Sequence, residues 1–498
     1  MENIIFGIPT IIICSIGYYF SWRFYKQGNY RYAVALLVLS GLGLYVFVSA
    51  DLFLHEWDER YHALVAKNLI QHPLIPTLYD NPLLPFDYKN WVGNHIWLHK
   101  QPLPLWVMAS SLSVFGINEI ALRLPSIIMS SIGIVLTYKI GKYFFDKKVG
   151  FLSAFLFSIN GLIIEMTGGR VATDHIDISF MFWILLSVFF TIKFINSKNI
   201  LFTFLVGISI GAAILTKWLT SLIVLPIWIL LVTDSKKLKL RTIISHFVLL
   251  LTVICAISLP WQLYIAHKFP LESAWESSFN YRHFTEVIEG RTGPFYYFLE
   301  RIRINYGELI YLPLIWFLWK TLKSFKDRKR LALSIWFVVP LLVFSAAKTK
   351  MQGYLLFTAP TLFIMSSEFF YMLLNYSKGR KFKWLIKLVL VLIIVLPIRY
   401  GIERIKPFKS LDRNPQWVLD LKELNKENIE KGVLFNYGNP IEAMFYTDFV
   451  VYTQLPEKKI ITDLIKQGYT IIVNDDNIPQ QISQMDGVIL RKLTPAND

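Results

Sequence analysis

Long apolar runs alternate with short polar loops along the chain as far as residue 399. A helix needs about 20 apolar residues to cross the hydrocarbon core of a bilayer. Runs of about that length lie at residues 4–22, 33–50, 123–145, 149–165, 178–195, 200–216, 218–233, 243–262, 304–320, 331–347, 355–374 and 384–399. A further run, 103–116, begins between Pro102 and Pro104 and is short for a span. The pattern predicts an α-helical polytopic membrane protein with about twelve spans.

The loops rich in Lys and Arg predict the orientation, because cytoplasmic loops carry an excess of these residues. They are Arg23–Arg31, Lys139–Lys148, Lys193–Lys198, Lys236–Arg241, Lys320–Arg330 and Lys378–Lys383. If all of them are cytoplasmic, the spans alternate correctly only when run 103–116 does not cross. We therefore expect this run to lie at the membrane surface within the first large outer loop, and both chain ends to lie outside.

From residue 400 onward the charge rises and short β-rich runs replace the apolar spans. These runs are Val433–Tyr437, Phe449–Tyr452, Thr470–Val473 and Val488–Leu490, with a helical segment at Glu457–Gly468. The alternation predicts a small α/β domain outside the membrane, residues 400–498. Residues 1–399 then form the transmembrane domain, with a catalytic outer loop at 51–104 and a second outer loop at 263–303.

Composition agrees with a membrane protein: 54% of residues are hydrophobic, 17% are charged and the mean hydropathy is +0.45. A net charge of +16 would point to nucleic acid in a soluble protein. Here the cations lie in loops between spans, without an array of Lys and Arg interleaved with stacking aromatics, so we expect no nucleic acid partner. Cys14 and Cys255 both lie inside apolar runs, which leaves no disulfide framework and no CxxC metal motif.

In this orientation acids and bases of both signs gather in the outer loops, whereas the inner loops hold little beyond Lys and Arg. The outer set contains Asp58, Glu59, His99, Lys100, Glu165, Arg170, Asp174, Asp177, Lys217, Arg282, Lys348, Lys350 and Tyr354. Ionisable groups are costly to place beside a membrane, so such a set indicates a functional site. The alternative is an interfacial loop whose aromatic residues lie at the headgroup level.

Asp58 and Glu59 follow an early span directly. A carboxylate at this place could orient or deprotonate an acceptor hydroxyl. The alternative is helix capping, because acids in a first turn favour the helix dipole. Both can hold, since a capping Glu59 would leave Asp58 free. Asp58 and Glu59 are therefore the catalytic candidates.

Four cations of the outer loops predict a phosphate site. Lys100 stands beside a proline-started helix, whose N-terminus attracts anions, although it could also snorkel to headgroup phosphates. Lys217 interrupts apolar sequence from Ile200 to Val232, which favours a hairpin with Lys217 at its outer tip over one long tilted helix.

Arg282 lies in the second outer loop, and Lys350 and Tyr354 lie where a later outer turn re-enters the membrane. The alternatives for them are a solvated loop charge and interfacial anchoring. Four cations with few neighbouring acids suit a phosphate or pyrophosphate at the bilayer surface.

Taken in order, these motifs resemble the GT-C membrane glycosyltransferases of family 39. This group includes the aminoarabinose–lipid A transferases and the protein O-mannosyltransferases. The resemblance runs from about residue 50 to 375. Its motifs are Asp58-Glu59-Arg60-Tyr61-His62-Ala63, Lys100-Gln101-Pro102-Leu103, Gly116 to Pro125, Leu215-Thr216-Lys217, Pro260-Trp261, Arg282-His283-Phe284 and Lys350 to Leu356.

The chain departs from the family pattern around one pair of positions. His99 stands where many relatives have an acid, Gln101 replaces the first Pro of a pair, and Trp275-Glu276-Ser277-Ser278 lacks the usual His. We therefore expect no metal site there, and no cofactor.

The resemblance implies an inverting transferase that moves a sugar from a polyprenyl-phosphate donor to a lipid, glycan or protein acceptor. It implies the outer face of a bacterial cytoplasmic membrane as the place of reaction. On this reading Lys100, Lys217, Arg282, Lys350 and Tyr354 bind the donor phosphate. His99, Tyr61, His62, Asp174 and Asp177 are further candidates. The alternatives are a transporter or flippase for an anionic lipid, which would favour broken helices in inverted repeats, and a non-catalytic lipid-binding scaffold.

Overall fold

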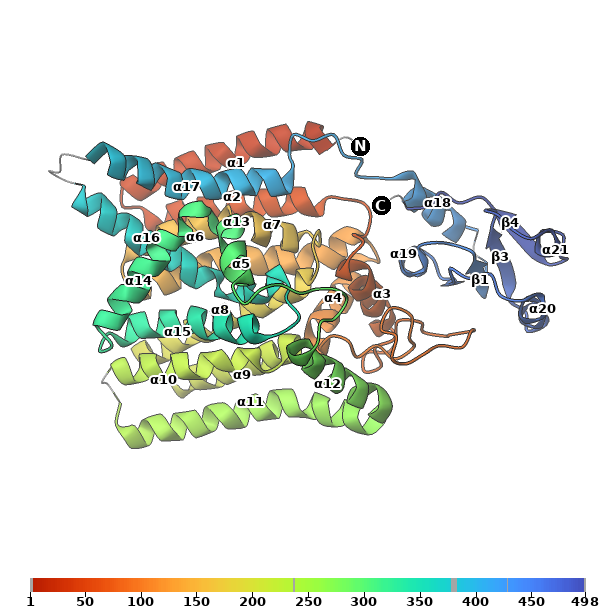
Figure 1. Ribbon diagram of the computed structural model, residues 1–498, viewed down its shortest axis with the longest axis horizontal. Helices are drawn as coiled ribbons and strands as arrows, with labels where there is room; N and C mark the ends of the chain where they lie inside the picture. Colours follow the sequence, from red (N-terminus) through yellow and green to blue (C-terminus); the bar gives the residue numbers. More distant parts are fainter. Residues whose placement is uncertain (1–2, 236–237, 378–382, 428, 497–498) are drawn as a thin grey trace.

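The computed structural model describes residues 3–235, 238–377, 383–427 and 429–496. Long helices run side by side in a bundle, and a small sheet stands beyond one end of it (Figure 1). Among the described residues, nine helices are long and apolar enough to cross a membrane, or ten if a bent pair forms one span. They are α1 (Asn3–Lys26), α2 (Tyr30–Ser49), α5 (Glu119–Phe144), α8 (Asp174–Ser197), Ile200–Asp234, α11 (Leu240–Lys268), α15 (Arg328–Ala346), Gln352–Tyr376 and α17 (Lys383–Ile405); the bent pair is α6 (Lys147–Ser158) with α7 (Gly161–Thr167).

The difference from about twelve predicted spans arises mainly at two places. Segment Ile200–Asp234 is one span by length, but it contains α9 (Ile200–Lys217), the 3₁₀ turn η1 (Trp218–Ile223) and α10 (Val224–Asp234). Trp218 breaks the helix with φ +57°, and the start of α9 and the end of α10 lie at the same end of the bundle (Figure 1). This is the hairpin that the sequence predicts, with Lys217 at its turn.

The second place is run 304–320, which the structure divides. It falls across α13 (Tyr297–Tyr306), the turn η2 (Glu308–Ile310) and α14 (Tyr311–Lys323). Gly307 separates α13 from η2 with φ +95°, a conformation that favours glycine. At 13 residues α14 is too short to count as a span by length. The chain is thus a multi-pass membrane protein whose helices are more broken than the apolar runs alone indicate.

The described parts of the basic loops lie at the bundle end remote from the sheet, as the predicted orientation requires (Figure 1). The ammonium of Lys147, the first residue of α6, lies 5.4 Å from the centre of the Tyr30 ring at the start of α2. Lys329, in the first turn of α15, donates a 3.1 Å hydrogen bond to the carbonyl of Tyr143 near the end of α5. Parts of two predicted basic loops, residues 236–237 and 378–382, lie outside the described residues.

The first outer loop folds into α3 (Asp58–Leu69) and α4 (Pro102–Phe115) at the other end of the bundle. The chain enters this end after α2 and leaves it at α5, where Glu119 contacts Tyr446 of the C-terminal part. Helix α4 therefore connects two points on the same side. This agrees with the prediction that run 103–116 does not cross.

The C-terminal part contains a four-stranded parallel sheet in the order β2-β1-β3-β4. The strands are β1 (Gly432–Phe435), β2 (Val450–Val451), β3 (Thr470–Asn474) and β4 (Val488–Arg491), close to the four predicted runs. Its helices are α18 (Gln416–Asn425), α19 (Pro440–Tyr446), α20 (Lys458–Lys466) and α21 (Gln480–Ser483). A parallel sheet needs cover on both faces. Here α20 and α21 cover one face, while the other shares a core with the outer-loop helices.

This shared core joins the sheet to the membrane part. Leu64 of α3, Leu105 of α4, Phe445 of α19 and Leu434 of β1 belong to one buried apolar cluster. Polar contacts add to it, because Arg60 pairs with Glu442 at 2.9 Å. The C-terminal part is thus packed against the helices that follow Asp58. A division at residue 399 stays a prediction, since α17 continues to Ile405 and α18 begins at Gln416.

Candidate functional site

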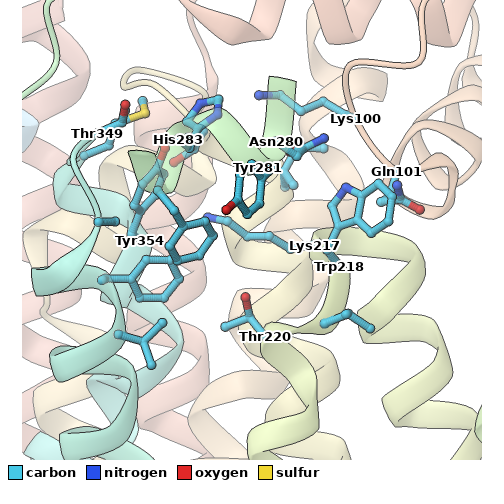
Figure 2. Close-up of a pocket in the computed structure, with 18 of the residues that line it drawn as sticks. Lys100, Gln101, Lys217, Trp218, Thr220, Asn280, Tyr281, His283, Thr349 and Tyr354 are labelled. Atoms are coloured by element: carbon cyan, nitrogen blue, oxygen red, sulfur yellow. The ribbon is translucent and has the colours of Figure 1, made fainter. Parts of the chain in front are cut away.

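A cavity of about 790 Å³ opens beneath the outer-loop helices. Its walls come from α3, the segment before α4, the start of α8, the α9–α10 turn, α12 (Pro270–Thr285) with the loop after it, α15, and the 3₁₀ segment η3 (Gln352–Thr358). Figure 2 shows Lys217 extending toward Tyr354, with Lys100 above it and Tyr281 of α12 nearby. Segments distant in sequence therefore bring their polar side chains to one space.

Both charged and apolar side chains line the cavity. The charged ones are Asp58, Lys100, Lys217, Glu289 and Arg291, and the Glu289 carboxylate lies 3.5 Å from the Arg291 guanidinium. The apolar walls come from the α9–α10 turn and from α15, in particular Leu219, Leu222, Ile223, Pro226, Val339, Pro340, Val343 and Phe344. Leu219, Val339 and Val343 are exposed, whereas Ile223 and Phe344 are buried. The shape fits an anionic group attached to a long hydrocarbon chain.

Asp58 is the first residue of α3, and its carboxylate lines the cavity. The carboxylate accepts a 2.8 Å hydrogen bond from the Thr173 backbone N–H and lies 3.9 Å from the Lys100 ammonium. Burial alone would raise the pKa of Asp58, but Lys100, His62 and the Thr173 N–H outweigh burial and hold the pKa below its usual range. Asp58 is therefore ionised at neutral pH and available to a substrate.

Glu59 has different surroundings, and its catalytic role stays a prediction. Its side chain is fully buried and accepts hydrogen bonds from Arg123 at 2.6 and 2.8 Å. The His55 backbone N–H donates to it at 2.7 Å, and the His175 ring lies 3.2 Å away. Glu59 does not line the cavity. With both oxygens occupied, it is placed to anchor α3 against α5 rather than to touch a substrate.

Lys217 caps the α9 hairpin and points into the cavity. Its ammonium pairs with Asp177 of α8 and lies 5.0 Å from the centre of the Tyr354 ring. Asp177 also accepts a hydrogen bond from the Thr173 hydroxyl. The predicted candidates Lys217, Tyr354 and Asp177 thus come together, and Tyr354 lines the cavity as well.

Lys100 and His99 lie at the cavity mouth. His99 stacks on Trp91 with ring centres 4.5 Å apart, and its Nδ1 lies 3.4 Å from the Glu276 carboxylate of α12. Burial and Lys100 lower the pKa of His99, so the ring is mostly neutral at pH 7. His99 and the segment around Glu276, two of the places where the chain departs from the family pattern, are therefore in contact. The expectation of no metal there stays a prediction.

Arg282 is not among the residues that line the cavity, and its role as a phosphate binder stays a prediction. Its guanidinium packs 4.7 Å from the centre of the Trp275 ring and lies 3.8 Å from the Glu286 carboxylate. Arg291, nine residues further along the same loop, lines the cavity instead. The sequence shows a cation in this loop but does not show which one faces inward, because that depends on how the loop folds back on the outer turn before η3.

Lys350 does not line the cavity either, so its predicted role as a phosphate binder also stays a prediction. Its side chain is buried, and its ammonium donates to the Ala347 carbonyl rather than lining the cavity. Its backbone N–H donates to the Arg291 carbonyl at 3.1 Å. Lys350 thus helps to hold the loop that carries Arg291.

The remaining candidates surround the cavity without lining it. Tyr61 is buried and packs on Trp91, with ring centres 4.8 Å apart. His62 and Asp174 form a fully buried pair, with Nδ1 and Oδ1 3.0 Å apart. His62 lies one helical turn after Asp58 and contributes to the low pKa of that carboxyl. Sequence reasoning missed Arg291, Trp91 and Thr173, none of which belongs to a motif that would single it out.

Comparison with known proteins adds three findings. The family model of the dolichyl-phosphate-mannose-protein mannosyltransferases matches residues 99–261. An undecaprenyl phosphate-alpha-4-amino-4-deoxy-L-arabinose arabinosyl transferase of Pseudomonas savastanoi is 25% identical over 58% of this chain and 55% of its own length. The corresponding protein of Photorhabdus laumondii is 27% identical over 63% of this chain and 54% of its own length. The match thus spans about half the length of these relatives.

Solved structures share the fold across most of the chain. ArnT from Cupriavidus metallidurans bound to undecaprenyl phosphate has a TM-score of 0.60 at 14% identity, covering 87% of this chain and 88% of that one. The oligosaccharyltransferase AglB from Archaeoglobus fulgidus has a TM-score of 0.53 at 14% identity, covering 84% and 64%. At this identity the likeness speaks for the fold alone.

Proposed function

This chain has the fold of the GT-C membrane glycosyltransferases, and from that premise we propose that it transfers a sugar from a polyprenyl-phosphate donor to an acceptor at the outer membrane surface. The observation that carries the proposal is the cavity, where Lys100, Lys217 and Arg291 stand above apolar walls and beside an ionised Asp58. A lipid phosphate and an acceptor hydroxyl would meet there.

The proposed chemistry follows from the charged side chains that line the cavity. When the sugar leaves the lipid phosphate, negative charge develops on the phosphate oxygens. Lys100, Lys217 and Arg291 would stabilise that charge in a partly enclosed site. Asp58 would orient the acceptor hydroxyl and take up its proton. Its low pKa makes it a weak base, so orientation is the larger part of this role.

The proposal extends to the surroundings of the reaction. We place the active site on the outer face of a bacterial cytoplasmic membrane, because the basic loops gather at the opposite end of the bundle. The sheet at residues 432–491 then lies outside the membrane. A pentose or hexose donor, and a lipid A, glycan or protein acceptor, fit the proposal equally.

A transporter or flippase remains the second candidate function, because the cavity would also hold an anionic lipid. It would need no ionised carboxylate beside the phosphate cations. The presence of Asp58 at 3.9 Å from Lys100 therefore favours the transferase.

Transfer is tested with the purified protein in proteoliposomes. Radiolabelled polyprenyl-phosphate sugars serve as donors, and an envelope extract from cells lacking the gene serves as acceptor. Label should move from the lipid to the extract. Movement of labelled lipid across the vesicle membrane without transfer of sugar would support the transporter instead.

Two variants separate the proposed roles. Asp58→Asn should lower turnover by about 10²–10⁴-fold, because it removes the carboxylate that orients the acceptor hydroxyl and takes up its proton, with donor affinity preserved. Lys217→Ala should weaken donor binding, because a cation that holds the phosphate acts in the ground state as well as in the transition state. Single-turnover rates and the affinity for undecaprenyl phosphate measure the two effects. Normal turnover in Asp58→Asn would reduce Asp58 to a helix cap.

A further inference from the structure

Thr173 precedes α8 and has an unusual backbone conformation. Its φ is +68° and its ψ is −8°, in the left-handed region that β-branched residues rarely adopt. Such a conformation persists only where surrounding contacts hold it, and it is frequent at functional sites. Thr173 also lines the cavity.

The two polar groups of Thr173 reach two different parts of the site. Its backbone N–H donates to Asp58 Oδ2 at 2.8 Å. Its hydroxyl donates to Oδ2 of Asp177, whose other oxygen, Oδ1, pairs with the Lys217 ammonium. Thr173 thus contacts the Asp58 carboxylate directly and is linked to the Lys217 ammonium through Asp177.

A third part of the site packs against the same point. A Cβ atom on Gly353 would lie 2.6 Å from the Thr173 hydroxyl oxygen and 2.7 Å from Asp177 Oδ2, closer than real Cβ contacts allow. Glycine is therefore required there, and it brings the backbone next to Tyr354 against Thr173 and Asp177. The tight fit fixes the distance between η3 and the start of α8.

We propose that Thr173 is a positioning residue that sets the place of the Lys217 ammonium relative to Asp58. This inference rests on the proposed function of the cavity. The hydroxyl occupies one oxygen of Asp177 and leaves the other to Lys217, so the ammonium pairs with one oxygen and keeps N–H groups directed at the cavity. Without the hydroxyl, Asp177 would offer both oxygens and draw the ammonium toward α8, away from a bound phosphate.

The test compares Thr173→Val with Thr173→Ser. Valine has nearly the same shape and branching but no hydroxyl, whereas serine keeps the hydroxyl. In Thr173→Val we expect the affinity for undecaprenyl phosphate and the donor KM to worsen by about tenfold or more, as for a lost hydrogen bond to a charged group. The kcat should fall by a smaller factor than the affinity, because the displaced Lys217 ammonium stabilises less of the developing phosphate charge while the backbone N–H to Asp58 is retained. Thr173→Ser should restore the affinity.

A double-mutant cycle decides whether Thr173 acts through Lys217. In a Lys217→Ala background, Thr173→Val should add no further loss of affinity, whereas in an Asp58→Asn background its effect should persist. Full additivity with Lys217→Ala, or equal losses in the Ser and Val variants, would overturn the proposal. A thermal unfolding scan of each variant identifies a simple folding defect.

Binding of undecaprenyl phosphate is measured without any transfer, so this result stands apart from the test of transferase activity. If the double-mutant cycle gave the expected affinities but the protein transferred no sugar, the positioning role of Thr173 would stand and only the proposed function would be rejected.

Discussion

Asp58 and Glu59 are neighbours on one helical turn, yet their carboxylates meet opposite surroundings. Asp58 faces the cavity and keeps access to it. Glu59 faces α5, where Arg123 is fully buried beneath it. Two adjacent helical residues point about 100° apart, so a pair of acids commonly divides between a site and a structural contact. In the proposed function, Asp58 is the carboxylate that meets the substrate, and Glu59 holds α3 against α5.

Arg282 and Arg291 offer a matched pair for testing the phosphate site. Arg291→Ala should weaken the affinity for undecaprenyl phosphate, because Arg291 lines the cavity. Arg282→Ala should leave it nearly unchanged, because that guanidinium packs on Trp275 outside the cavity. The loss for Arg291 should be about tenfold or more, the scale of a charge-assisted hydrogen bond. The opposite ranking would restore Arg282 as the phosphate binder.

At the scale of elements, the position of α3 depends on the buried pair between Glu59 and Arg123. Gly169 shows how tightly this region is packed, because a Cβ there would lie 2.2 Å from Glu59 Oε1, and its φ of +75° also favours glycine. Burial would raise the pKa of Glu59, but Arg123 and His175 hold it well below its usual range. Its stabilising contribution is therefore present above the ordinary carboxyl pKa and is lost as the pH falls below it.

Glu59→Gln should destabilise the protein, because it removes the carboxylate that is in direct contact with the buried Arg123 guanidinium. Breaking a buried ion pair in this way costs about 3–5 kcal/mol. The exposed neighbour Glu56 provides the control, and Glu56→Gln should unfold at nearly the wild-type temperature. Thermal unfolding in detergent measures both variants. If Glu59→Gln kept full stability but lost turnover, Glu59 would return to the catalytic group.

The elements themselves follow from the sequence better than the contacts between them do. Apolar runs of about 20 residues give the spans, and short β-rich runs give the four strands, because each signal is local. The hairpin at Lys217 is also predictable, since a lone Lys in so long an apolar run is costly elsewhere. The partner of Glu59 is 64 positions away, and the choice of Arg291 depends on how a loop folds back. Neither leaves a local signal.

At the scale of the whole molecule, the C-terminal part packs directly against α3, the helix that begins with Asp58. Lys67, near the end of α3, donates to the carbonyls of Met444, Phe445 and Thr447 at 2.9, 3.2 and 2.7 Å. These carbonyls belong to the last turn of α19 and the residue after it, and some have no partner within their helix. A lysine from the membrane part thus caps a helix of the C-terminal part.

Lys67→Met tests whether this junction supports the reaction. Methionine keeps much of the side-chain volume but has no N–H donor. The carbonyls of α19 then lose their hydrogen bonds from Lys67, which should lower the free energy of unfolding by about 1–3 kcal/mol. We expect a lower unfolding temperature and reduced turnover, because α3 also carries Asp58. Affinity for undecaprenyl phosphate should stay near wild type, since Lys217 and Tyr354 lie on other elements. Lys458→Met, on the exposed side of α20, is the control. If Lys67→Met and Lys458→Met had the same turnover and the same unfolding temperature, the contact of Lys67 with α19 would not influence α3 or Asp58.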